Sequence, residues 1–400
     1  MNKVRGVQTR QLLTATLAIG FIGRAAFLLL TPTFYAPDER PHFEYVKYLA
    51  EQHSLPVSTT ATDEYFQPPL YYLLLTPFYS LAHALSLRDS ITVRILRAFS
   101  ILLWGITVLL AFKFLECLSV DDAFVKIFVV GMIALLPTFT FLSSVINNDN
   151  LILPIGAAIL WLLVRPEPSL KNSALIGILL GLGLLTKLTA IVYAPLIALT
   201  LLMRFRKTGA PLVLLHLALS IIPALIIWSP WALRAWGLYG SLSGMSGTVP
   251  FEWGTAIPVI WGELGEINKT FWAVSGEYNN VSSFYPIVGK LLFYLSLAGL
   301  LYGLLFKRER LISLAREDAA VMLASALAIL INLVLILILL YHQGQGRYLF
   351  PLLIPIALLM AVGLRVFPAS GAANSRIHVS AFFITYVLSF ICFSLAVFRA

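Results

Sequence analysis

Charged residues are scarce in this 400-residue chain: they make up 12% of the sequence, while 59% of the residues are hydrophobic. A soluble globular domain carries more charge than this on its surface, so the composition indicates a polytopic membrane protein. Cysteine is nearly absent, and because Cys117 and Cys392 fall in a predicted cytoplasmic loop and a predicted span, no disulfide framework is implied. The net charge of +9 is therefore interpreted by its position across a membrane, and no nucleic-acid partner is expected.

The sequence also lacks internal repeats, low-complexity regions and any soluble domain, so residues 1–400 are predicted to form one polytopic membrane domain. The first apolar run is too long for a signal peptide, and no small-residue cleavage site follows it before Pro32, which predicts a retained first helix. Apolar stretches of spanning length predict a bundle of about eleven transmembrane helices. These stretches are 11–31, 91–112, 126–143, 150–164, 173–186, 188–203, 211–230, 287–306, 319–341, 348–366 and 378–398.

A twelfth apolar stretch, residues 68–85, carries three prolines and has a marginal length for a span. We therefore expect it to form a helix in or near the outer membrane interface. With a cytoplasmic N-terminus, this choice places most Lys and Arg residues on the inner side, as the positive-inside rule requires. It leaves two large extracytoplasmic segments, 32–90 and 231–286, and the expected location is the plasma (inner) membrane.

The first outer segment opens with a polar cluster, "APDERPHFEYVKYLAEQHSLP", at residues 36–56. Its two early prolines predict a helix start with Asp38 as the N-cap. At 100° per residue, Asp38, Glu39 and His42 fall on the apolar side of this helix. That side should face the membrane body, where ionisable groups are costly unless they are paired or used in a site. The simpler alternative is that Asp38 only caps the helix.

Further polar groups are expected at the same outer level. "SVINNDNL" places Asp149 at a turn between two spans, and "LLTKLTA" places Lys187 at the end of another. "HQGQGRYLFP" brings Arg347 and Tyr348 to the start of a later span. Each has a plain explanation, because an acid suits an exposed turn and long basic side chains snorkel at span ends. Together, these carboxylates and cations predict proton abstraction beside a bound anion such as a phosphate.

These segments resemble the GT-C superfamily of membrane glycosyltransferases, most closely the branch of aminoarabinose transferases and protein O-mannosyltransferases and its uncharacterised bacterial relatives. The matching segments lie in the family's order between about residues 36 and 356: "PDERPHFEYVKYLAEQHSLP", "FQPPLYYLLLTPFY", "VRILRAFSILLWG", "SVINNDNL", "GLGLLTKLTAI", "NKTFWAVSGEYN" and "GQGRYLFPLL". The resemblance implies an all-α, GT-C-like bundle with juxtamembrane helices in the first extracytoplasmic loop. It also implies an inverting glycosyltransferase that moves a sugar from a polyprenyl-phosphate donor to a lipid or glycan acceptor on the extracytoplasmic side.

The resemblance also implies roles for individual residues. Asp38 would be the base with Glu39 beside it, and Asp149 would orient the acceptor or a metal. The donor phosphate would contact Lys187 and Arg347. The remaining expected substrate-binding residues are His42, Gln67, Tyr348 and Trp272.

Gln67 and His42 depart from the pattern of the characterised family members, and Trp272 has a second explanation. Gln67 stands where the aminoarabinose enzymes carry an acid, so a divalent metal ion is an expectation without assigned ligands. His42 matches only the uncharacterised relatives of the family. The segment "FWAVSGEY" offers Phe271, Trp272 and Tyr278 as faces for a sugar, but aromatic residues at this level commonly form an interfacial belt.

The sequence also leaves two other function classes open. A secondary transporter or lipid flippase would place ionisable residues at mid-span and show inverted repeats, and only Arg24 in the first span fits that pattern. A non-catalytic lipid-binding assembly subunit would be favoured by loss of the acid pair, which this sequence retains.

Overall fold

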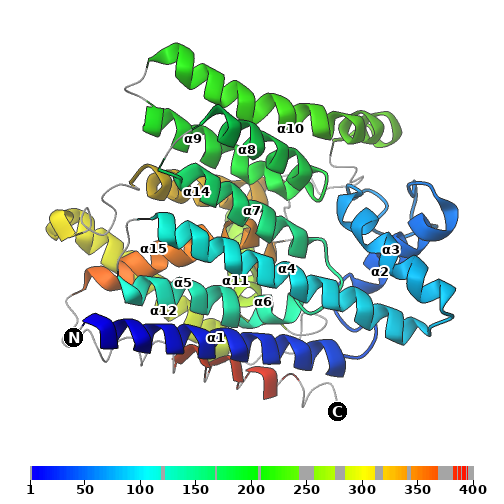
Figure 1. Ribbon diagram of the computed structural model, residues 1–400, viewed down its shortest axis with the longest axis horizontal. Coiled ribbons are helices and arrows are strands. Elements are labelled where there is room, and N and C mark those ends of the chain that lie inside the picture. Colours follow the sequence, from blue (N-terminus) through cyan, green and yellow to red (C-terminus); the bar gives the residue numbers. More distant parts are fainter. Residues whose placement is uncertain are drawn as a thin grey trace.

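In the computed structural model the chain forms a bundle of α-helices whose long members run side by side (Figure 1). The structure describes residues 2–118, 122–166, 169–205, 209–242, 256–274, 284–310, 319–339, 344–367 and most of 382–394. These residues contain no β-strand. The elements are α1 (Asn2–Leu30), α2 (Glu39–Gln52), α3 (Leu70–Ala84), α4 (Asp89–Cys117), α5 (Ala123–Leu135), α6 (Pro137–Leu142), α7 (Asp149–Val164), α8 (Leu170–Leu184), η1 (Leu188–Val192), α9 (Tyr193–Phe205), α10 (Ala210–Tyr239), α11 (Ala256–Trp272), α12 (Phe284–Phe306), α14 (Ala319–Leu339), η2 (Gly346–Leu352) and α15 (Leu353–Val366).

Several of these helices are long and apolar enough to cross a membrane. Their outward faces carry large apolar side chains, such as Ile226 and Leu233 of α10, which are 65% and 72% exposed. Such continuous apolar faces suit a lipid environment and not water. The seven segments that meet the length and hydropathy requirement are Thr9–Leu30, Asp89–Cys117, Leu188–Phe205, Ala210–Tyr239, Phe284–Phe306, Ala320–Ile338 and Gly346–Val366. The chain is thus an all-α, multi-pass membrane protein.

The predicted spans correspond to helices, with breaks where the backbone cannot continue its hydrogen bonds. The stretch predicted at 126–143 is divided into α5 and α6, because Pro137 has no N–H to donate to the carbonyl oxygen of Ile133. The stretches at 188–203 and 348–366 begin with the 3-10 segments η1 and η2. The predicted span at 378–398 lies partly outside the described residues.

Arg24, fully buried in α1, satisfies the carbonyl oxygens that this break exposes. Its Nη1 donates to the carbonyl oxygen of Ala134 at 2.7 Å, and its Nη2 to that of Ile133 at 3.3 Å. Its Nε donates to Ser143 Oγ at 2.7 Å, and the guanidinium lies 4.2 Å from the ring centroid of Trp104. These contacts give Arg24 a structural role at the break between α5 and α6. A transport pathway is therefore not required to explain a buried arginine in α1.

Helices α2 and α3 lie together at one end of the bundle, beyond most of the long helices (Figure 1). Tyr45 of α2 stacks on Tyr72 of α3 with ring centroids 3.8 Å apart. The outer side of α3 exposes Leu74, Phe78 and Leu81. A 15-residue helix with an exposed apolar stripe fits the interfacial helix predicted at 68–85.

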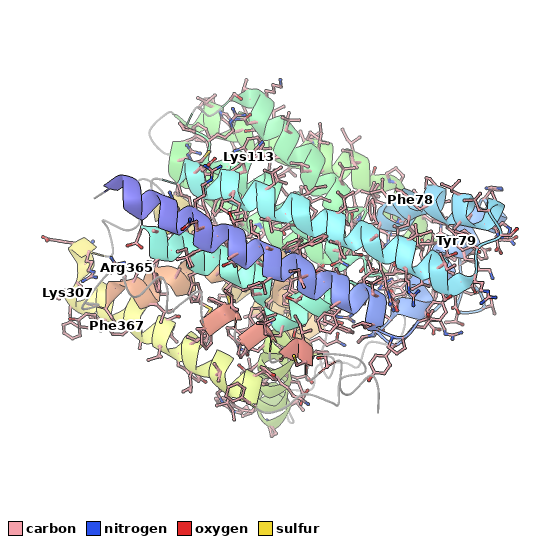
Figure 2. The ribbon with its side chains drawn as sticks, turned by 60° about the horizontal axis from the view of Figure 1, so that its bottom comes forward. Phe78, Tyr79, Lys113, Lys307, Arg365 and Phe367 are labelled. Carbon is pink, nitrogen blue, oxygen red and sulfur yellow. The ribbon has the colours of Figure 1, made fainter. Side chains whose placement is uncertain are left out.

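Basic side chains gather at the opposite end of the bundle. Lys113, Lys307 and Arg365 lie there, far from Phe78 and Tyr79 of α3 (Figure 2). All three basic residues belong to the segments that the charge pattern assigns to the cytoplasm. The bundle therefore has one basic end and one end that carries the α2–α3 pair.

Candidate active site at the α2 end

Asp38 precedes α2, as predicted, but its side chain does not cap the helix. Its backbone has φ 59°, a left-handed conformation that Asp tolerates better than most residues, and its carboxylate makes no capping hydrogen bond. Instead, Nη2 of Arg347 in η2 donates to Asp38 Oδ2 at 2.5 Å. The N-cap prediction is therefore right about the position and wrong about the side chain, because a charge-assisted bond to a cation is stronger than a bond to a backbone N–H.

A second acid–cation pair joins Asp149 and Lys187. Asp149 is the first residue of α7, where the helix dipole favours an anion, and Lys187 directly precedes η1. Lys187 Nζ donates to Asp149 Oδ1 at 2.7 Å, and their side chains are only 11% and 5% exposed. Asp149 Oδ2 is buried without a hydrogen-bond partner. Lys187 thus points into the protein and does not snorkel toward water.

Tyr348 brings the two pairs together. Its ring centroid lies 5.7 Å from Lys187 Nζ and 5.8 Å from the Arg347 guanidinium carbon. Both cations can interact with the π face of this ring, which stabilises positive charge in a site with little water. Two cations far apart in the sequence therefore face one aromatic side chain.

A small cavity adjoins the Asp38–Arg347 pair. Its volume is about 10 Å³, which is room for roughly one water molecule. Small-molecule pockets typically measure about 300–1,000 Å³, so a sugar needs side chains here to move. The lining residues are Pro37, Thr138, Leu142, Thr270, Val274, Gln345 and Arg347.

The pKa of the Asp38 carboxyl lies below its ordinary value. Burial raises this pKa, but the charge of Arg347, the nearby His42, the hydrogen bond from Arg347 and the charge of Lys187 together lower it by more. Because the folded-state pKa is depressed, the pair adds stability at neutral pH, which is lost as the pH falls through that depressed pKa. Asp38 is therefore ionised at neutral pH, but it is a weak base while Arg347 holds it.

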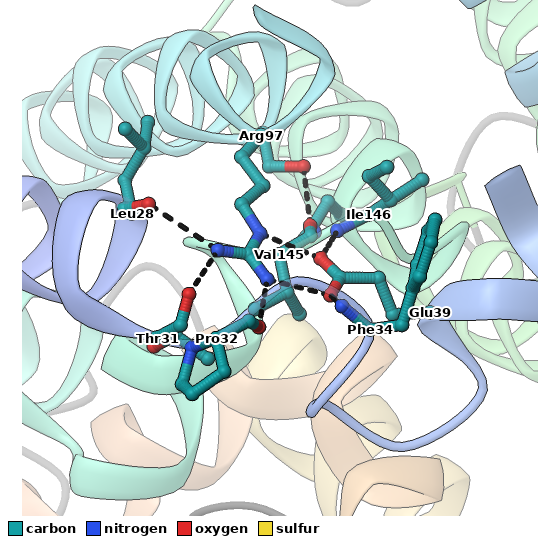
Figure 3. A network of polar contacts seen from close by, with 10 residues as sticks. Leu28, Thr31, Pro32, Phe34, Glu39, Arg97, Val145 and Ile146 are labelled. Atoms are coloured by element: carbon teal, nitrogen blue, oxygen red, sulfur yellow. Dashed lines mark hydrogen bonds and ion pairs between the residues drawn. The ribbon is translucent and has the colours of Figure 1, made fainter. Parts of the chain in front are cut away.

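Glu39 belongs to a separate buried network with Arg97 of α4 (Figure 3). Arg97 donates from Nε to Oε1 at 2.7 Å and from Nη2 to Oε2 at 2.6 Å. Glu39 also accepts the backbone N–H groups of Phe34 and Ile146, at 3.1 and 3.2 Å. Arg97 in turn donates to three carbonyl oxygens at the end of α1. A carboxylate engaged by four donors fits a structural role better than the catalytic one that the resemblance implied.

His42 and Gln67 take part in a polar network beside the Asp149 turn. His42 Nδ1 lies 2.9 Å from Tyr72 Oη. Asn148 Nδ2 donates to Gln67 Oε1 at 3.2 Å and to Tyr72 Oη at 3.4 Å. Burial lowers the pKa of His42, so its imidazole is neutral near pH 7. Asn148 Oδ1 and Asn147 Nδ2 are buried without a partner, which leaves polar atoms able to bind a ligand hydroxyl.

Trp272 lies in a helix interface. Its ring packs against Gly289 of α12, where a Cβ atom would come within 2.0 Å of the indole. It also contacts Phe271 edge-on at 5.1 Å and is only 4% exposed. This position favours helix packing over stacking on a sugar. Tyr278 lies outside the described residues.

The described side chains of this site do not fit a divalent metal ion. Across the part of the chain that the structure describes, no three His, Cys, Asp or Glu side chains gather as ligands. Asp38 and Asp149 each face a cation, and the neutral Gln67 stands where the resemblance expects an acid. The reaction proposed for this site therefore uses the protein's own side chains.

Comparison with known proteins identifies the fold. No protein-family model and no curated protein matches the sequence. The crystal structure of ArnT from Cupriavidus metallidurans bound to undecaprenyl phosphate matches with a TM-score of 0.53 and 18% identity, over 90% of this chain and 60% of that chain. The fold is that of ArnT. The apo structure of the same protein matches at a TM-score of 0.44 and 14% identity, over 94% of this chain and 77% of that chain.

The ArnT match confirms the all-α membrane fold that the resemblance implied. This chain spans only 60% of the length of the undecaprenyl-phosphate-bound ArnT chain. At 18% identity the two proteins share a backbone arrangement, and the chemistry of this site depends on its own residues.

Proposed function

We propose that the protein is an inverting glycosyltransferase that moves a sugar from a polyprenyl-phosphate donor to a lipid or glycan acceptor. The observation that carries this proposal is the pair of buried cations, Lys187 and Arg347, which face one ring and each bind a carboxylate. A phosphate beside a base is the chemistry that such a set serves. The ArnT structure of the same fold contains undecaprenyl phosphate, which supports this class of donor.

The proposed reaction is a single displacement at the sugar carbon that carries the phosphate. Lys187 and Arg347 bind the phosphate and neutralise the charge that it gains as it leaves. Asp38, within about 3 Å of the acceptor hydroxyl, takes its proton as the oxygen attacks. The carbon–oxygen bond to the phosphate breaks and its electron pair stays on the phosphate. Attack from the opposite face inverts the sugar, and Asp38 then releases its proton to water.

The turn before α7 supplies candidate contacts for the reacting hydroxyls. Asn147 Nδ2, Asn148 Oδ1 and Asp149 Oδ2 are buried and unpartnered, and each such atom costs free energy unless a ligand satisfies it. We assign these groups to the sugar or the acceptor. We place this end of the bundle on the extracytoplasmic side because the basic end carries Lys113, Lys307 and Arg365.

The location of the charges favours a transferase over a transporter. The cations and acids of the site lie at helix starts at one end of the bundle, whereas a transporter site is expected near mid-membrane. The buried Arg24 is already bonded to carbonyl oxygens.

The lipid that accompanies the purified protein tests this proposal. The protein is extracted in mild detergent, and its bound lipids are compared with the total membrane lipids by mass spectrometry. We expect enrichment of a polyprenyl phosphate or a polyprenyl-phosphate sugar. Repeated absence of such lipids, together with ion-coupled uptake by proteoliposomes, would contradict the proposal in favour of a transporter.

A further inference from the structure

Both cations of the proposed donor site are already bound to carboxylates. The Arg347–Asp38 and Lys187–Asp149 distances, 2.5 and 2.7 Å, are those of strong charge-assisted hydrogen bonds. The cavity beside Arg347 has room for roughly one water molecule. A phosphate that binds these cations therefore meets a carboxylate already bound to each of them.

We propose that Asp38 and Asp149 compete with the donor phosphate for Arg347 and Lys187, so that donor binding itself releases Asp38 to act on the acceptor. This inference rests on the proposed function and adds a mode of regulation to it. In this scheme the donor is the first substrate to bind, because Arg347 holds Asp38 until the donor phosphate arrives.

The local structure of Asp38 suits a carboxylate that changes partners. Its side chain is 36% exposed, while that of Arg347 is 11% exposed, so the acid can turn toward solvent while the cation stays in place. No helix-capping bond restrains the carboxylate. The backbone next to it is restrained, because Glu39 is held by Arg97 and by the N–H groups of Phe34 and Ile146. A side-chain rotation is therefore sufficient to release the base.

Asp149 shows the same arrangement in a more buried form. Only Oδ1 is engaged by Lys187, and Oδ2 is buried without a partner. When a phosphate takes Lys187, Asp149 gains a second free oxygen in the same turn as the unpartnered Asn148 Oδ1 and Asn147 Nδ2. Donor binding thus completes a set of polar atoms that an acceptor hydroxyl can use.

Binding of undecaprenyl phosphate to the protein in nanodiscs tests the competition. Asp38→Asn and Asp149→Asn each remove a competitor without removing a cation. Each is expected to tighten lipid binding by at least about two- to fivefold, because even an exposed ion pair contributes up to about 1 kcal/mol. In a Lys187→Met background, Asp149→Asn is expected to give no such gain, because the cation for which it competes is gone.

Glu64→Gln is the matched control for a general change in charge. The charge of Glu64 acts on the pKa of His42, yet in the described structure Glu64 forms no ion pair with either cation. An equal gain for Glu64→Gln, or unchanged or weaker binding for the two aspartate variants, would overturn the competition. If Lys187→Met and Arg347→Gln also bind like wild type, the donor site itself fails. If those two variants weaken binding, the donor site stands and the competition alone is rejected.

Discussion

Asp38→Asn is expected to give a folded, normally inserted protein whose transfer activity is lowered roughly 10²-fold or more, the usual contribution of a positioned base. The fold should persist because Asn accepts the left-handed backbone conformation at φ 59° about as well as Asp. No capping bond is lost, since the Asp38 side chain makes none. The amide cannot accept the hydroxyl proton, so the loss should appear in the turnover of the donor lipid that co-purifies with the protein.

Asp122→Asn is the matched control for this loss. Asp122 also forms a short ion pair, with Arg365 at 2.5 Å, but Arg365 lies at the basic end of the bundle. Its Oδ1 caps α5, and Asn can keep that cap. We expect near wild-type transfer from Asp122→Asn. If Asp38→Asn is active while Asp149→Asn is inactive, the base is Asp149, and if both are active the transferase mechanism is wrong.

Glu39→Gln is expected to lower the free energy of unfolding by about 3–5 kcal/mol, because it leaves the buried Arg97 without its counter-ion. Arg97 and Glu39 are 1% and 0% exposed and join the end of α1 to α2, α4 and the turn before α7 (Figure 3). Thermal unfolding in detergent, followed by tryptophan fluorescence, should show a clear fall in the melting temperature. The double variant Glu39→Gln/Arg97→Met should recover part of the loss, since it removes both buried charges together.

The same variant separates two roles for Glu39. If Glu39 is structural, its replacement lowers the stability of the protein. Activity at low temperature then falls only as far as the replacement displaces Asp38. A catalytic residue would leave the melting temperature unchanged while abolishing transfer. The second pattern would restore the catalytic role that the family resemblance implied for Glu39 and would reject the structural role.

The sequence predicts the helices and the meeting of the charged groups for a simple reason. An ionisable group at the end of an apolar helix can lie only at the membrane surface or in a protein site. Such groups are few in this chain, so the candidates for one site can be recognised from the sequence: Asp38, Asp149, Lys187 and Arg347. The burial of Glu39 and His42 follows in the same way from the apolar side of α2. Helical periodicity alone is sufficient to predict that these two side chains are buried.

The pairing of the charges could not be predicted, because it depends on contacts between distant segments. Glu39 and Arg97 are 58 positions apart, and no local pattern shows which acid an arginine will bind. The sequence does show that Arg97 lies within an apolar stretch. A cation buried there requires an acid as its partner, but the sequence does not show which acid. Likewise, the left-handed backbone of Asp38 arises from the restrained turn between α1 and α2, which propensity does not show.

The central claim, that Lys187 and Arg347 form one site for a lipid phosphate, is tested most directly by the dissociation constant of undecaprenyl phosphate. We expect Lys187→Met/Arg347→Gln to weaken binding at least about tenfold relative to wild type, because each lost charged hydrogen bond contributes roughly 1.5–3 kcal/mol. Lys113→Met/Lys307→Met, which removes the same charge at the opposite end of the bundle, should bind like wild type. Equal binding by the wild type and Lys187→Met/Arg347→Gln would contradict the account.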